Sequence, residues 1–154
     1  MGRRRSLLAA LIGLFLSDIA RGEDILVVAN PSVSLGRPLN AGDIAAIYLL
    51  RITLWPDGSA IIPVNREISS DVRARFTVGV LHQDNASLIV YWNEMHFKGK
   101  SPPVVQESEQ ALLTFIRKVP GSVGYISGGG GGVPDGVVVL AKLSIAAGSG
   151  GGGQ

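Results

Sequence analysis

Residues 61–76 read IIPVNREISSDVRARF, a short apolar run that passes through an arginine and two serines directly into a helical pattern. The apolar run 61–65 predicts a buried strand. Apolar residues spaced by four then predict an amphipathic helix that begins at Ser69 or Ser70 and ends near Leu81. A strand that leads through so short a turn into a helix favours a layered α/β fold.

The same alternation of strands and helices continues on both sides of this segment. Residues 25–29 form a continuous apolar run rich in β-branched residues, which is typical of a strand buried on both faces in a parallel sheet. Helix-start signals and short apolar runs give the other elements: helices after Asn40, after Asp84 or Asn85 and after Ser108, and strands at 123–126 and 137–140. These elements predict an α/β domain with a mixed, mostly parallel sheet flanked by helices.

The two ends of the chain differ from its middle in composition. Three arginines precede the apolar run 7–16, and small residues stand before Glu23, so residues 1–22 have the pattern of a secretory signal. The run is shorter than the roughly 20 residues that span a bilayer, although a retained anchor is the alternative. Either a general or a twin-arginine export route places the protein in the periplasm or outside the cell.

The predicted domain occupies residues 23–147. Within it, residues 128–132 are five consecutive glycines, which predict a flexible loop because ordering glycine costs more backbone entropy than ordering any other residue. Residues 148–154 predict a disordered glycine-rich tail.

Charge and cysteine content exclude several classes of function. The chain has 14 basic and 12 acidic residues, but residues 1–22 contain four arginines and one aspartate, which leaves 10 basic and 11 acidic residues. A net charge of −1 gives no basis for nucleic-acid binding. With no cysteine, neither disulfides nor thiolate chemistry are available.

The sequence offers no arrangement of residues for catalysis or metal binding. His82 and His96 are the two histidines, and their spacing is not that of a metal site. The glycine run lacks the Gly-Lys-Ser/Thr ending of a phosphate loop, and a Gly-x-Ser-x-Gly elbow is missing. We therefore expect a protein that is not an enzyme and uses no cofactor.

The start of the helix after residue 68 is a candidate anion site. The first N–H groups of a helix have no partner inside it and carry a partial positive charge, which hydroxyls and a nearby Arg66 reinforce. Ser69 and Ser70 are the hydroxyl candidates, although serines at this position are also simple helix caps. Arg66 has an equal alternative as a structural ion pair with a carboxylate, namely Asp43, Glu67 or Asp71. Further along, Arg73 and Arg75 are predicted on a solvated helix face.

A spaced set of motifs runs through residues 25–127. The motifs are Ile47-Tyr48-Leu49, Trp55-Pro56-Asp57-Gly58, Val64-Asn65-Arg66, Ser70, Arg73, Phe76, Tyr91-Trp92, Phe97-Lys98-Gly99, Pro102-Pro103, Ser108-Glu109 and Pro120-Gly121-Ser122-Val123-Gly124-Tyr125. Together they resemble the short phosphate ABC transporter substrate-binding-like proteins of the type 2 periplasmic-binding-protein-like superfamily. The resemblance implies a single periplasmic-binding-protein-like lobe.

The resemblance also implies a ligand and its site. Full-length phosphate receptors of this superfamily bind the anion at an Arg-x-x-Gly-Ser-Gly-Thr turn, in which Arg66 and Ser70 match the arginine and the serine. Ser69 and Asp71 replace the two glycines, and the Asp71 carboxylate opposes a phosphate at short range. Ser32 and Ser34 are candidates for the first phosphate-contacting loop.

These observations predict a secreted, non-catalytic substrate-binding-like module for phosphate or a related oxyanion. Binding is expected to be weak, because one lobe leaves the site open to water. A membrane transporter is an implied partner. The alternative is a module that keeps the fold without the ligand and acts as an accessory of an envelope transporter, sensor or secretion assembly.

Overall fold

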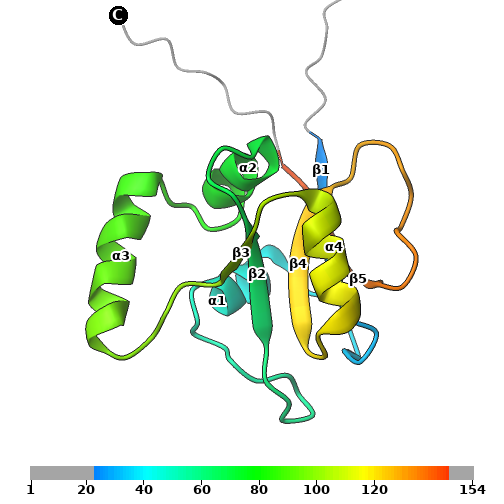
Figure 1. The fold of residues 1–154 in the computed structure, drawn as a ribbon, viewed down its shortest axis with the longest axis horizontal. Coiled ribbons are helices and arrows are strands. Elements are labelled where there is room, and N and C mark those ends of the chain that lie inside the picture. The colour runs from blue at the N-terminus through cyan, green and yellow to red at the C-terminus, as the bar shows by residue number, and fades with distance from the viewer. Residues whose placement is uncertain (1–22, 146–154) are drawn as a thin grey trace, which may run out of the picture.

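Four helices and five strands form within residues 23–145, the part of the chain that the computed structural model describes (Figure 1). In chain order they are β1 (Asp24–Ala29), α1 (Ala41–Tyr48), β2 (Ile62–Arg66), α2 (Asp71–Gly79), α3 (Asn85–Phe97), β3 (Val104–Gln106), α4 (Glu109–Lys118), β4 (Ser122–Ser127) and β5 (Val138–Ser144). The predicted signal at 1–22 and the predicted tail at 148–154 lie outside the described residues.

The strands form one sheet in the order β3-β2-β4-β1-β5. Strand β2 pairs in parallel with β3 and β4, whereas β1 pairs antiparallel with both β4 and β5. Four strands therefore point one way and β1 points the other, so the predicted mixed, mostly parallel sheet is confirmed. The expectation that β1 is a parallel strand is wrong, because a continuous apolar run reports burial on both faces and carries no information on direction.

Side chains alternate along β1 between two helical layers. Ile25 and Val27 pack in the core beneath α1 and α2, whereas Val28 packs beneath α4 on the opposite face. Figure 1 shows α4 on one face of the sheet and α1 on the other. The chain is thus a three-layer α/β domain, in which β1 is buried from both sides.

Three aromatic rings fill the space between the sheet and helices α1 and α2. The Phe76 and Tyr125 rings are stacked with centroids 3.9 Å apart, and Tyr48 meets Phe76 edge-on at 4.7 Å. The Tyr48 hydroxyl donates to the carbonyls of Val64 on β2 (2.9 Å) and Val123 on β4 (3.3 Å). Burial raises the pKa of Tyr48, so the phenol stays neutral and keeps donating.

The predicted helix starts are confirmed by their caps. Asn40 begins α1 with a reciprocal capping box, in which its side chain accepts from Asp43 N (2.8 Å) and its own N–H donates to the Asp43 carboxylate (2.9 Å). Ser70, Asp84 and Ser108 cap α2, α3 and α4.

Strand β3 has no counterpart in the sequence prediction. It is three residues long and follows Pro103, and both Val104 and Val105 are exposed, so it lacks the burial pattern by which a strand is recognised. It pairs with β2 at the edge of the sheet.

Helix α3 stands at the side of the sheet, away from the other helices (Figure 1). Leu88 and Met95 are buried, and the Tyr91 hydroxyl donates to Leu49 O (2.5 Å), whereas the side chains of Ile89 and Phe97 are 62% and 90% exposed. Among the described residues, no helix combines the length and apolar character that crossing a membrane requires.

A test of the packing at the start of β4 compares alanine substitutions at three glycines. Gly121 has φ +78°, and a Cβ there would overlap Ala60 O, whereas Gly58 has φ +85° with open space around it, and Gly130 has open space and no positive φ. We expect Gly130→Ala to be near neutral, Gly58→Ala to cost about 1 kcal/mol, and Gly121→Ala to cost about 3 kcal/mol or more. Urea unfolding measures all three, and equal losses at Gly58 and Gly121 would contradict the predicted overlap.

Candidate anion-binding site

The strand, turn and helix predicted at residues 61–76 are all present. Strand β2 ends at Arg66, a tight turn follows, and the N–H of Ser70 donates to Glu67 O (3.0 Å) to close it. Ser70 is the N-cap of α2, and its hydroxyl accepts from Arg73 N at 3.4 Å. The turn therefore brings the arginine at the end of β2 close to the first amides of α2.

The side chain of Arg66 is engaged with the next residue. Its Nε and Nη2 each donate to a Glu67 carboxylate oxygen at 3.2 Å, and the arginine side chain is only 11% exposed. These bonds from Arg66 lower the pKa of Glu67, so the carboxylate remains charged. Of the three carboxylates considered from the sequence, Glu67 is the partner, whereas Asp43 pairs with Arg37 (2.7 Å).

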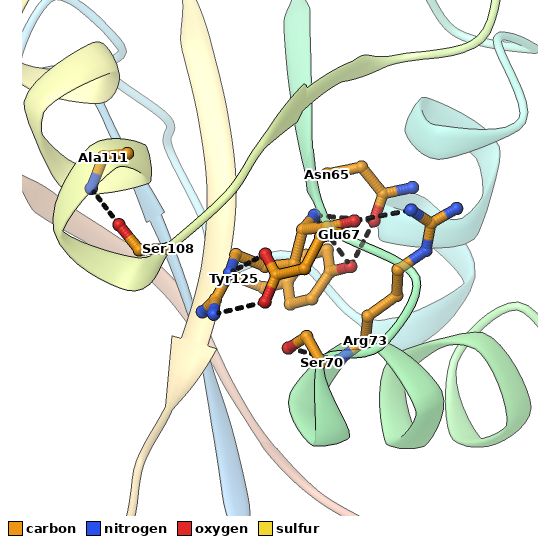
Figure 2. Close-up of polar contacts among 8 residues, drawn as sticks. Asn65, Glu67, Ser70, Arg73, Ser108, Ala111 and Tyr125 are labelled. Carbon is orange, nitrogen blue, oxygen red and sulfur yellow. Dashed lines mark hydrogen bonds and ion pairs between the residues drawn. The ribbon is translucent and has the colours of Figure 1, made fainter.

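Arg73 belongs to this turn, although the sequence placed it on a solvated helix face. Its Nη1 donates to Arg66 O at 2.5 Å, so the side chain folds back from α2 onto the end of β2 (Figure 2). Phe76 and Thr77, three and four residues later, are both buried, which puts Arg73 on the inward side of the helix. This spacing of Arg73 relative to Phe76 is visible in the sequence and could have predicted that Arg73 lies on the inward side of the helix.

Arg75 also has a partner instead of a purely solvated position. It pairs with the Glu23 carboxylate (3.0 Å) and donates to Glu23 O (3.1 Å). Its charge is therefore used to hold the segment before β1 against α2.

The backbone at the end of β2 is fixed from behind by Tyr125 of β4. The Tyr125 hydroxyl donates to Asn65 Oδ1, which also accepts from Arg66 N at 3.0 Å (Figure 2). Burial raises the pKa of Tyr125, so this donor stays protonated. The position of Arg66 thus depends on the aromatic core.

The two serines of the turn have different surroundings. Ser70 is 8% exposed and occupied as a cap, whereas Ser69 is exposed to solvent at the tip of the turn. Asp71, in the first turn of α2, is exposed as well.

The structure does not bring Ser32 and Ser34 to this site. The Ser32 hydroxyl accepts from Gly121 N (3.0 Å), which places its loop beside the start of β4, whereas Arg66 lies at the end of the parallel strand β2. Strand β4 has six residues, so the two edges are about 20 Å apart at about 3.3 Å per residue. The reversed direction of β1 is the cause, because its carboxyl end meets the amino ends of β2 and β4.

No group of three His, Asp or Glu side chains able to hold a metal ion occurs within residues 23–145. The turn offers two arginines and two carboxylates, together with the hydroxyls and first amides of α2. This set suits weak recognition of an oxyanion and contains no nucleophile paired with a base.

Comparison with known proteins shows which solved structures share this fold. No family model matches the chain, and no curated protein matches it. Among solved structures, it is similar to a phosphate ABC transporter substrate-binding protein from Clostridium perfringens with bound phosphate, at 20% identity and TM-score 0.59 over 77% of this chain and 44% of that one. An ABC-type phosphate transport receptor from Vibrio cholerae gives 21% identity and TM-score 0.59 over 77% and 45% of the two chains. PstS from Borrelia burgdorferi gives 15% identity and TM-score 0.53 over 68% and 40%.

These likenesses confirm the fold that the sequence resemblance implies. The described domain has the periplasmic-binding-protein fold found in phosphate receptors. The chain spans less than half the length of each of these three proteins.

A comparison of the two serines tests their structural roles. We expect Ser70→Ala to lower the free energy of unfolding by about 1 kcal/mol through loss of the cap, and Ser69→Ala to change it by less than about 0.5 kcal/mol. Thermal and urea unfolding of both variants provide the measurement. Equal effects would show that Ser70 is not a working cap.

Proposed function

We propose that this protein is a non-catalytic binding module that takes phosphate or a related oxyanion weakly at the start of α2. Arg66, Ser69 and the amides that follow Ser70 form the site, whereas Ser32 and Ser34 take no part. The observation that carries the proposal is the closed turn from Arg66 to Ser70, which joins the arginine at the end of β2 to the first amides of α2 within a few residues. The likeness to phosphate receptors in fold supports the choice of ligand.

The affinity follows from the groups present. A helix start contributes up to about 2 kcal/mol and a charge-assisted hydrogen bond about 1.5 to 3 kcal/mol. A free energy of about 4 kcal/mol corresponds to a dissociation constant of about 1 mM. Glu67 occupies the guanidinium and Asp71 adds a second negative charge, so the site is not tuned for tighter binding.

The setting of this activity is part of the proposal. The protein acts in the periplasm or outside the cell after export by the signal predicted at residues 1–22. A membrane transporter or another envelope protein is the partner that would complete the open site.

Phosphate binding is tested by titrating the ¹⁵N-labelled protein with phosphate at constant ionic strength and following the amide signals of Asp71 and Val72. Saturable shifts are expected in the millimolar range, with sulfate and molybdate as related oxyanions. Glu67→Gln is expected to tighten binding by about tenfold because it frees Arg66 and removes a repelling charge, and Arg66→Gln to abolish it.

The matched control is Glu94→Gln, which removes one negative charge from the exposed side of α3 and should leave phosphate binding unchanged. The proposed site would be contradicted if the amide shifts of the parent protein did not saturate with phosphate, or if Glu67→Gln and Glu94→Gln changed phosphate binding equally.

The second candidate is an accessory module that binds an envelope protein and no anion. Two observations favour it: the bidentate Glu67 contact already satisfies Arg66, and α3 presents the exposed side chains of Ile89, Val90 and Phe97. Exposed apolar side chains gathered on one element are a feature of interaction surfaces.

This alternative is tested with a photo-crosslinking residue placed at Phe97 and, as a control, at the exposed Thr114 of α4. A specific envelope partner captured at Phe97, absent at Thr114 and unaffected by phosphate would favour the accessory module. Identical products from both positions would contradict it.

A further inference from the structure

A hollow lies between α3 and the end of β2, apart from the anion site. It has a volume of about 250 Å³, and neither Arg66 nor Ser69 nor Ser70 lines it. It is lined from α3, which stands at the side of the sheet (Figure 1), and from segments next to β2 and β3. It is somewhat smaller than the roughly 300–1,000 Å³ cavities that hold drug-sized ligands, so it suits a small molecule.

Most of its wall is apolar. The indole of Trp92 and the side chains of Leu88 and Ile89 form the α3 side, and Ile68 and Pro103 face them from the loops next to β2 and β3. The neighbouring Tyr91 ring meets Trp92 edge-on with centroids 5.0 Å apart and restrains it. Such a wall favours a hydrocarbon body over a bare inorganic ion, which would lose its hydration without compensation.

The hollow also has polar lining residues, and the only charged one among the residues that the structure describes is positive. Arg73 and Asn65 line it near the end of β2, Asn85 and Asn93 line it from α3, and no Asp or Glu is among the described residues that line it. Figure 2 shows Arg73 reaching back from α2 to the end of β2, where Asn65 lies.

Arg73 is able to accept an anionic guest. Its Nη1 is used by Arg66 O, and within the described part of the chain it belongs to no ion pair. A carboxylate could take the remaining N–H groups of the guanidinium. An ammonium group would meet the arginine with no acidic residue among the described ones that line the hollow, which disfavours amines and zwitterions.

We propose that this hollow binds a small monocarboxylate with a hydrocarbon body, whose carboxylate lies on Arg73 and whose apolar part lies on Trp92. Although Arg73 also bonds Arg66 O, the proposed phosphate site is formed by Arg66, Ser69 and backbone amides, and neither Arg66 nor Ser69 lines the hollow. The two proposed sites therefore differ in the side chains that contact the ligand and in the class of ligand.

The probe is phenylacetate, with the neutral phenylacetamide as its isostere. The chain has two tryptophans, and Trp55 is buried with its indole N–H donated to Gly121 O (2.9 Å); neither Trp55 nor Gly121 lines the hollow. In ¹H–¹⁵N spectra, phenylacetate should shift the indole signal of Trp92 saturably at millimolar concentration and leave that of Trp55 in place. Phosphate should not move the Trp92 signal. The Trp92 indole signal therefore tests carboxylate binding in the hollow, and the Asp71 amide signal tests phosphate binding at α2, so one proposal can be contradicted while the other stands.

Charge dependence gives the decisive comparison. Arg73→Gln should weaken phenylacetate binding at least about tenfold, whereas Arg75→Gln, two residues along the same helix, should leave it unchanged and Arg73→Lys should keep it within a few-fold. Phenylacetamide should bind the parent protein at least about tenfold more weakly than phenylacetate.

The proposal is overturned if phenylacetate leaves the Trp92 signal unmoved, if the two glutamine variants behave alike, or if phenylacetamide binds as tightly as phenylacetate. The last comparison needs no variant, so it decides the question even if Arg73→Gln does not fold.

Discussion

The buried hydroxyl of Tyr48 holds together the two strands on which the rest of the domain depends. The pairing of β2 with β4 couples Ile62 with Ser122 and Pro63 with Val123, and just beyond it the Tyr48 hydroxyl donates to a carbonyl on each strand. An unpaired carbonyl buried at this place would cost about 1–3 kcal/mol. The Tyr48 hydroxyl therefore stabilises the fold in addition to the packing of its ring. Helix α1 is thereby fixed to the centre of the sheet.

Tyr125 extends this arrangement from the core to the surface. Its ring stacks on Phe76 of α2, and its hydroxyl bonds Asn65 at the end of β2. One side chain therefore sets both the position of α2 and the backbone that precedes Arg66. The proposed oxyanion site and the hollow beside α3 share this support, so both proposed sites depend on the same core. The two proposed sites use different arginines, because the Arg66 side chain bonds Glu67 whereas Arg73 lines the hollow.

Residues that carry the resemblance to phosphate receptors act mainly in the fold. Trp55 bonds the carbonyl of Gly121, so the turn after α1 and the start of β4 are joined. Likewise Tyr48 connects α1 to β2, and Tyr125 connects β4 to β2. A spaced set of such residues identifies the fold even at 20–21% identity, because each fixes one contact between distant segments. The ligand follows less directly, because the Arg66 turn differs at Ser69 and Asp71.

The sequence by itself determined the local structure: the caps at Asn40 and Ser108, the starts of α2 and α3 to within one residue, and the strand–turn–helix unit at Arg66. Local signals suffice there, because capping and periodicity involve residues three or four positions apart. Tertiary structure decided the direction of β1, and with it the distance between Ser32 and Arg66. It also turned Arg73 inward and paired Arg66 with Glu67 instead of Asp43 or Asp71. Strand direction depends on contacts between segments far apart in the chain, which no local pattern encodes. The choice among the three carboxylates depends on how the folded turn directs the Arg66 side chain.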